Sequence, residues 1–293
     1  MKVLVTGAAG KLGSAVCAHL LEHGLDVTAT DRKHRARVGS RFVLADLCDD
    51  LEVYKLLDGC EAVVHLGNHP HLNAAASPQR LLAENTAMNA NVFRAALDVG
   101  IRRIVFASSV QAMIKIDNGL RVEPPYPIPY LPLDGEAPAN PGSNYYGLSK
   151  EFAERLLRLH SEATPDLAAT SLRFPGLVSE EWLERFTAGG KPAPRASFNF
   201  GELLAYLMFS DAAELVRLTL ERQLPGYHQY YPAQTLEVRG LTVASLIADT
   251  YPNVPLRRPA SEIDALVDVS AITAALGWAP RHRATVQFAS DVL

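Results

Sequence analysis

Short apolar runs, rich in β-branched residues, alternate with helical periods along the first 174 residues of the chain. Runs of this kind are typical of strands buried on both faces, and the leucine and valine spacing between them predicts helices. The alternation predicts an α/β fold, a doubly wound parallel sheet with helices on both faces. The predicted strands span residues 3–6, 27–30, 42–45, 62–66, 104–107 and 168–174.

Longer helices are predicted where apolar residues recur every three or four positions, at residues 78–99, 144–160 and 201–222. Seven prolines between residues 115 and 143 predict a structured loop, because proline interrupts helices and strands. The chain beyond residue 174 is less regular. We expect there a helix at 179–187, a Gly/Pro break at 189–194, a strand at 228–231 and two short C-terminal helices.

A glycine-rich turn joins the first predicted strand to the first predicted helix. Gly7 permits a tight turn, Gly10 lets the backbone approach a pyrophosphate, and Gly13 lets the helix pack closely against the strand. Amides at the positive end of the helix would hold the pyrophosphate. With a strand before it, a helix after it and an acidic residue about 20 positions on, the motif predicts a bound dinucleotide.

Asp31, at the end of the second strand, is that acidic residue. Its carboxylate can accept both adenosine ribose hydroxyls and would repel a 2′-phosphate, so we predict NAD rather than NADP. Arg32 and Lys33 follow directly and could hold a 2′-phosphate, which keeps NADP as the alternative. Asp46 and Leu47 are placed to flank the adenine ring, although Asp46 could equally cap the next helix.

Tyr146 and Lys150 lie four residues apart on one predicted helix, so both side chains share a face. A nearby ammonium and a positive nicotinamide ring would both lower the pKa of Tyr146 toward neutral pH, where the phenol can exchange protons with a substrate. The fifth strand ends at Ser108-Ser109, and side-chain alternation turns Ser109 into the cleft. Without the other motifs, two serines ending a strand would indicate only a turn.

Together these motifs resemble the extended short-chain dehydrogenase/reductase superfamily, in its NAD-dependent epimerase/dehydratase branch. The resemblance extends to the segments 64–67, 173–176, 209–211 and 267–278. It implies that Ser109 and Tyr146 bind the substrate oxygen, that Tyr146 carries the proton and that Lys150 tunes it. The predicted cofactor contacts are Gly7, Gly10, Lys11, Leu12, Gly13, Asp31, Arg32, Asp46, Leu47, Leu66, Gly67, Asn85, Ser108, Tyr146, Lys150, Phe174 and Pro175.

At two places the chain lacks residues that particular members of that family carry. Val110 and Gln111 stand where sugar-nucleotide dehydratases carry an Asp-Glu pair, so dehydration is not expected, and no Asn follows the sixth strand to clasp a diphosphate sugar. The segments 106–109 and 145–150 look most like uronate dehydrogenases. Three histidines in the loop after the fourth strand are interpreted as polar groups at the rim of the site, and no metal site is predicted. The predicted substrate contacts are Asn68, His69, Ser109 and Gln111.

We therefore predict an NAD-dependent oxidoreductase that transfers hydride at a secondary alcohol or carbonyl of a small sugar or sugar-acid-like substrate. A nucleotide-sugar epimerase that retains NAD is the alternative. A non-catalytic nucleotide-sensing regulator is less favoured, because a sensor has no need of Ser109, Tyr146 and Lys150. We expect an NAD-binding domain at residues 1–174 and a mainly substrate-binding region at 175–293, part of which returns to the core.

Composition adds the remaining expectations. A net charge of −4 without a Lys/Arg block indicates neither a nucleic-acid nor a membrane partner. Three cysteines with no C-x-x-C spacing, and an N-terminus without a signal-peptide core, predict reduced thiols and a cytoplasmic protein. The apolar arcs of helices 78–99 and 144–160 are wider than one sheet face covers, and the resemblance also implies pairing through these helices. A homodimer is therefore expected.

Overall fold

The computed structural model describes residues 1–34, 41–115, 124–187 and 192–289. Its centre is a seven-stranded parallel sheet in the order β3-β2-β1-β4-β5-β6-β9, which confirms the predicted doubly wound fold. The strand order reverses between β1 and β4, and this reversal opens a crevice at the carboxyl ends of the strands. The strands are β1 (Lys2–Thr6), β2 (Asp26–Asp31), β3 (Arg41–Leu44), β4 (Ala62–His65), β5 (Arg103–Ser109), β6 (Ala168–Phe174) and β9 (Gly226–Tyr230).

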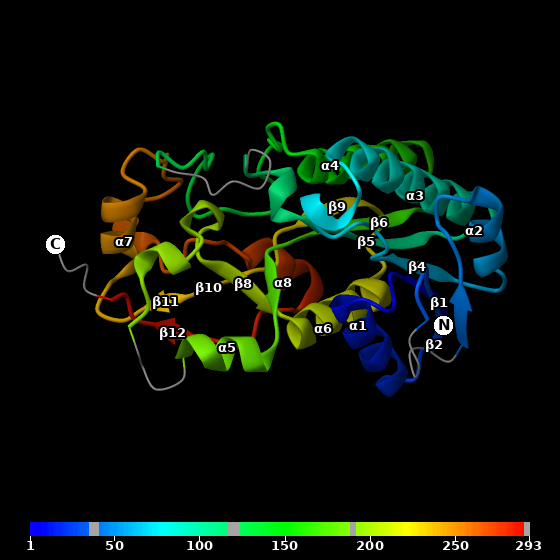
Figure 1. The fold of residues 1–293 in the computed structure, drawn as a ribbon, viewed down its shortest axis with the longest axis horizontal. Helices are drawn as coiled ribbons and strands as arrows, with labels where there is room; N and C mark the ends of the chain where they lie inside the picture. Colours follow the sequence, from blue (N-terminus) through cyan, green and yellow to red (C-terminus); the bar gives the residue numbers. More distant parts are fainter. Residues whose placement is uncertain (35–40, 116–123, 188–191, 290–293) are drawn as a thin grey trace.

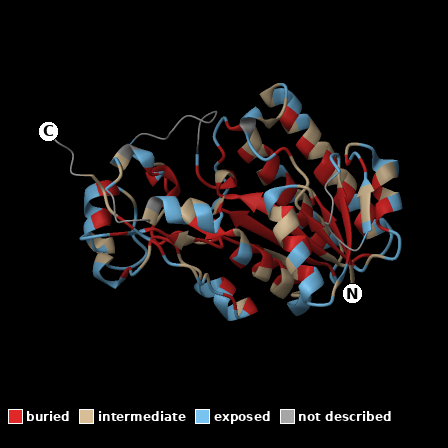
Figure 2. Cartoon of the chain, turned by 60° about the horizontal axis from the view of Figure 1, so that its bottom comes forward, coloured by how far each residue is buried: buried red, intermediate tan, exposed pale blue. Residues whose placement is uncertain are grey.

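Helices cover both faces of this sheet (Figure 1). Side chains alternate along β1, so that Val3 and Val5 pack with one face and Leu4 with the other. The strands between the helix layers are largely buried (Figure 2). One layer contains α1 (Lys11–Glu22) and α6 (Phe209–Arg222), and the other contains α2 (Asp50–Leu56), α3 (Pro78–Asp98) and α4 (Tyr145–Ala163).

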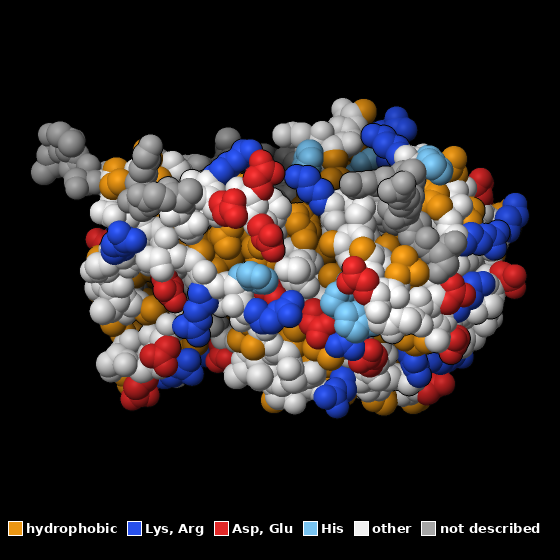
Figure 3. All heavy atoms as spheres, turned by 90° about the horizontal axis from the view of Figure 1, so that it is seen from below, with side chains coloured by type: hydrophobic (Ala, Val, Ile, Leu, Met, Phe, Trp, Pro, Cys, Tyr) orange, Lys and Arg blue, Asp and Glu red, His pale blue; other side chains and the backbone are white. Residues whose placement is uncertain are grey.

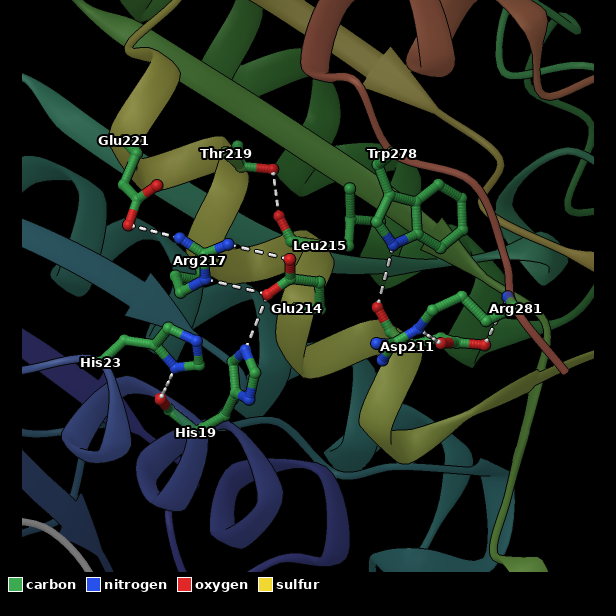
Figure 4. A network of polar contacts seen from close by, with 10 residues as sticks. All are labelled: His19, His23, Asp211, Glu214, Leu215, Arg217, Thr219, Glu221, Trp278 and Arg281. Carbon is green, nitrogen blue, oxygen red and sulfur yellow. Dashed lines mark hydrogen bonds and ion pairs between the residues drawn. The ribbon is translucent and has the colours of Figure 1, made fainter.

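Polar side chains join α1 to α6 (Figure 4). The His19 Nε2 lies 2.8 Å from Glu214 Oε2, and Arg217 donates to both oxygens of the same carboxylate at 2.9 and 2.8 Å. Near the start of α6, the indole of Trp278 donates to the backbone carbonyl of Asp211 at 3.1 Å. These contacts tie residues from the C-terminal region to the layer that carries the glycine-rich turn.

Most of the remaining elements form a third apolar cluster beside the carboxyl edge of the main sheet, whereas α8 (Ser270–Leu276) packs with α1 and α6. A three-stranded sheet contains β7 (Gly176–Val178), β8 (Ala205–Met208) and β10 (Gln234–Thr235), and β11 (Glu237–Val238) pairs with β12 (Thr285–Val286). The helix predicted at 179–187 is α5 (Glu180–Thr187), and the two predicted C-terminal helices are α7 (Val243–Thr250) and α8 (Ser270–Leu276). In the structure, α6 and β9 pack with the central sheet.

The helix predicted at residues 201–222 is wrong over its first third. The segment expected to be helical from residue 201 contains a short 3-10 turn and β8, and the helix begins only at Phe209. Leu203 and Leu204 have φ angles of 62° and 55°, which a right-handed helix cannot accommodate. Most residues around them are buried, and a buried strand cannot be told from a buried helix by periodicity alone. The proline-rich loop and the Gly/Pro break lie partly outside the described residues, at 116–123 and 188–191.

Within the described ranges, no helix combines the length and the apolar character needed to cross a bilayer. Seen from below, basic and acidic side chains are interspersed (Figure 3). Cys17, Cys48 and Cys60 are free thiols, and Cys17 is buried.

Candidate active site

The glycine-rich turn lies between β1 and α1, where it forms a cradle without side chains. A Cβ on Gly13 would come 2.2 Å from the Gly7 carbonyl oxygen, so only glycine allows this approach of helix and turn. Gly10 is the N-cap of α1 and offers no side chain to the amides of the first turn. Those amides have no partner within the helix and suit a pyrophosphate.

Asp31 is held against this cradle. Its Oδ2 accepts from the Ala9 amide at 3.1 Å and its Oδ1 from the Lys33 amide at 3.2 Å. Because each carboxylate oxygen has a second lone pair, both ribose hydroxyls of an adenosine can still donate to it. The cradle and this carboxylate therefore fit NAD.

A cavity of about 910 Å³ connects the cradle to the end of β5. It has room for both a cofactor and a small substrate. Of the residues predicted as cofactor or substrate contacts, those that line it are Gly7, Gly10, Lys11, Leu12, Gly13, Asp31, Arg32, Leu47, Leu66, Gly67, Asn68, His69, Ser108, Ser109, Gln111, Tyr146, Lys150, Phe174 and Pro175.

Asp46 and Asn85 depart from their predicted positions, because neither lines this cavity. Asp46 is exposed, and its carboxylate accepts from the Cys48 amide at 3.0 Å, closing a local turn. Asn85 is fully buried, accepts from the His69 amide at 2.8 Å and donates to Ser149 Oγ at 3.1 Å. Asn85 thus holds the loop after β4 against α4 instead of facing a cofactor.

Tyr146 and Ser109 meet at the carboxyl edge of the sheet, where the Ser109 side chain lies close enough to lower the pKa of the phenol. A Cβ on Gly147 would come 2.2 Å from the Gln111 carbonyl oxygen, so a glycine here lets α4 approach the turn that follows β5. Ser108 turns the other way, as alternation predicts, and donates to Glu154 at 2.6 Å. Close packing of α4 therefore places the phenol beside Ser109.

Lys150 lies one helical turn further along α4 and is almost fully buried. Its Nζ donates to Asn68 Oδ1 at 2.8 Å and to the Ala107 carbonyl at 2.7 Å, and lies 5.6 Å from the centroid of the Tyr146 ring. These contacts aim the ammonium at the cavity side of the phenol.

The pKa values of the two groups differ from the expectation. The pKa of Tyr146 is raised to about 12, mainly by burial and in smaller part by the charge of Glu202, against a lowering effect of Ser109. Burial also lowers the pKa of Lys150 to about 7. The protein alone therefore favours the neutral phenol, because desolvation disfavours the charged phenolate. A positive nicotinamide ring would supply the opposing charge when NAD+ is bound.

Two of the three histidines at the end of β4 and in the loop after it have protein partners. His65 is fully buried between Thr6 Oγ1 and Asn89 Oδ1, at 2.7 and 2.9 Å, and burial lowers its pKa to about 3. His69 Nε2 contacts the Glu84 carboxylate at 2.5 Å. These rings are consequently oriented by the loop and by α3.

Sequence reasoning missed Glu202, a buried carboxyl group in the cavity lining. Burial raises the pKa of Glu202 to about 7, and the neighbouring side chains of Gln111 and Asn199 lower it in part. The residue follows Gly201 in a segment expected to be helical, and no motif marks it.

A model of the NAD dependent epimerase/dehydratase family matches residues 3–211. The chain therefore belongs to this family, which confirms the resemblance, identifies the protein as an enzyme and gives NAD as its cofactor.

Curated relatives act on several sugars. An NAD-dependent glucose-6-phosphate dehydrogenase of Haloferax volcanii is 31% identical over 194 residues, 64% of this chain and 72% of the relative. An L-arabinose 1-dehydrogenase (NAD(P)(+)) of the same organism is 36% identical over 162 residues, 53% and 59% respectively. A uronate dehydrogenase of Pseudomonas putida is 29% identical over 156 residues, 52% and 53%. The chain thus matches little more than half the length of the last two.

Solved structures share the fold over nearly the whole chain. A mutated uronate dehydrogenase has a TM-score of 0.62 at 23% identity, covering 96% of this chain and 82% of that one. A UDP-glucose-4-epimerase from Stenotrophomonas maltophila with bound NAD has a TM-score of 0.66 at 21% identity, covering 96% and 94%. At these identities the likeness concerns the fold alone.

Proposed function

We propose that this protein is an NAD-dependent dehydrogenase that oxidises a secondary alcohol of a small sugar-like substrate, or reduces the matching carbonyl, at Ser109, Tyr146 and Lys150. The observation that carries the proposal is the meeting of the three side chains at the end of one cavity whose other end is the glycine cradle. The named relatives include dehydrogenases of sugars, which agrees with this assignment.

In the proposed reaction Ser109 and Tyr146 hold the carbinol oxygen, and Tyr146 takes its proton. Bound NAD+ supplies the acceptor for the hydride, so the carbinol carbon loses two electrons and becomes a carbonyl. Lys150 keeps its ammonium beside the phenol and stabilises negative charge on the phenol oxygen. Because these side chains are buried, little water can enter and compete with the substrate.

The test is NADH formation by purified protein offered NAD+ and a panel of aldoses, uronates and sugar phosphates. We expect stoichiometric NADH and carbonyl product from at least one compound. Absence of NADH with every class, in a protein shown to bind NAD+, would contradict the proposal.

A nucleotide-sugar epimerase is the second candidate, because the chain belongs to the NAD dependent epimerase/dehydratase family. An epimerase returns the hydride to the same sugar, so it must retain its cofactor. NAD that survives gel filtration, with sugar inversion and no net NADH, would favour the epimerase.

We further propose that the protein works in the cytoplasm as a homodimer. The free thiols suit a reducing compartment. Phe152 and Leu159, which are 43% and 53% exposed on α4, offer apolar surface for a second copy.

A further inference from the structure

Glu202 lies in the cavity, and the proposed hydride transfer does not use it. The residue ends the short 3-10 turn Phe200–Glu202 and is only 9% exposed. It lines the same cavity as Ser109, Gln111 and Tyr146, and its charge raises the pKa of Tyr146. Its carboxyl group is therefore within electrostatic reach of the phenol that would hold the substrate oxygen.

A chain of amide side chains fixes this carboxyl relative to Tyr146. Asn144 caps α4 and accepts from the Tyr146 amide at 2.9 Å, while its own Nδ2 donates to Gln111 Oε1 at 2.8 Å. Because the Gln111 oxygen accepts from Asn144, the NH2 group of Gln111 is left to face the Glu202 carboxyl, whose pKa Gln111 lowers. The same residues thus position the phenol and the carboxyl.

The backbone after Glu202 adopts a conformation that side chains disfavour. Leu203 and Leu204 have φ angles of 62° and 55°, and both side chains are buried. The amide of Leu204 donates to the Asn199 carbonyl at 3.0 Å, and the Leu204 carbonyl accepts from Leu236 at 3.0 Å. Strained backbone held by its surroundings in this way is concentrated at functional sites. Here it forms the irregular turn that presents Glu202 to the cavity.

No cation among the described lining residues pairs with Glu202. Lys11, Arg32 and Lys33 belong to the nucleotide end of the cavity, and Lys150 donates to Asn68 and the Ala107 carbonyl. The two side chains that lower the pKa of Glu202, Gln111 and Asn199, are neutral amides. An anionic substrate group placed here would meet a like charge in a water-poor site, where repulsion is strong. A hydroxyl would instead find an acceptor.

We propose that Glu202 determines substrate specificity: it accepts a hydrogen bond from a hydroxyl next to the reacting carbinol and selects uncharged polyhydroxy sugars over sugar acids, sugar phosphates and nucleotide sugars. This inference rests on the proposed function and narrows its substrate class. Rejection by like charge is a recognised route to specificity. Under this proposal the substrate is not one of the uronates that the motifs of residues 106–109 and 145–150 suggest.

The test compares two sugars that differ at one carbon, glucose and glucuronate. Their binding to the NADH complex is measured by titration calorimetry at mildly alkaline pH, where the carboxylate of Glu202 is ionised. Glu202→Gln keeps the shape and removes the charge, so glucuronate should bind at least about tenfold more tightly to it than to the wild type. Glucose should change far less. Glu181→Gln, which alters an exposed carboxylate on α5, is the matched control and should change neither sugar.

Glucuronate binding that is no tighter in Glu202→Gln, or undetectable in both proteins, would overturn the proposal. So would a wild-type kcat/KM for glucuronate above that for glucose, and in that case the dehydrogenase assignment would survive. If the charge effect on binding is seen but no sugar yields NADH, the selectivity stands and the proposed hydride transfer fails. The experiment thus distinguishes failure of the specificity proposal from failure of the proposed hydride transfer.

Discussion

The Lys150 ammonium lies 2.8 Å from Asn68 Oδ1, so a residue predicted to contact substrate instead makes its shortest side-chain contact with the proposed catalytic lysine. Asn68 Nδ2 in turn donates to Asn89 Oδ1 at 2.9 Å, which fixes the orientation of the amide. The loop after β4 therefore influences the proposed proton transfer through its contact with Lys150, although Asn68 also lines the cavity.

Substitutions at Asn68 should move the pKa of Lys150 in opposite directions. Asn68→Ala removes an acceptor that stabilises the ammonium, so the pKa falls further and the ammonium is lost at lower pH. The alkaline limb of the kcat/KM profile should then shift to lower pH. Asn68→Asp adds a negative charge and should shift this limb to higher pH. Asn73→Ala, at an exposed position of the same loop, is the control, and shifts of the same sign in both Asn68 variants would contradict the assigned role.

Removing the phenol oxygen tests the proton carrier. Tyr146→Phe should lower turnover by at least about a hundredfold, the usual scale for an acid–base group, while NAD+ binding stays nearly intact. Lys150→Met should do similar damage and also weaken NAD+ binding. Steady-state NADH formation and NADH fluorescence titration give the two quantities separately. Near-wild-type turnover of Tyr146→Phe would remove Tyr146 from the mechanism.

Asp31 should decide the choice between cofactors. We expect the wild type to bind NAD+ at least about tenfold more tightly than NADP+, because the carboxylate accepts ribose hydroxyls and repels a 2′-phosphate. Asp31→Asn keeps an acceptor for the Ala9 amide and removes the charge, so the preference should shrink mainly through tighter NADP+ binding. Calorimetric titration of both cofactors measures this. Tighter NADP+ binding by the wild type would show that Arg32 and Lys33 dominate.

The buried ion pair between Glu154 and Arg173 should matter for stability. Arg173 donates to both Glu154 oxygens, at 2.9 and 2.7 Å, and to the Gly135 and Ala137 carbonyls. Glu154→Gln leaves a buried guanidinium without its counter-charge and should lower the free energy of unfolding by about 3–5 kcal/mol. Urea unfolding followed by fluorescence measures the change. Glu181→Gln, which breaks an exposed pair, should leave the urea midpoint unchanged, and an equally small effect at Glu154 would refute the argument.

The strands and the cofactor cradle were predictable because their signals are local. A buried parallel strand is encoded by a short apolar run. A glycine at position 13 indicates that the helix approaches the turn closely. Ser109, Tyr146 and Lys150 followed from strand ends and helix periodicity in the same way. Glu202 was not predictable, since the left-handed backbone at Leu203 and Leu204 depends on contacts with residues distant in sequence, such as Leu236. Asn85 was misplaced for a related reason: sequence places it near the site, but packing decides whether its amide faces the ligand or the loop.

The last prediction concerns assembly through α4. Phe152 and Leu159 lie seven residues apart on one side of that helix, both exposed, and α3 packs alongside. Pairing with a second copy about a twofold axis would bury them, so light scattering at micromolar concentration should return twice the 31.8 kDa of one chain. Leu159→Glu should produce monomers that still bind NADH, because the residue lies outside the described cavity lining. Leu51→Glu, at an exposed position on α2, should stay dimeric. A wild-type monomer at this concentration would rule out the α4 dimer, and a Leu159→Glu dimer would move the interface elsewhere.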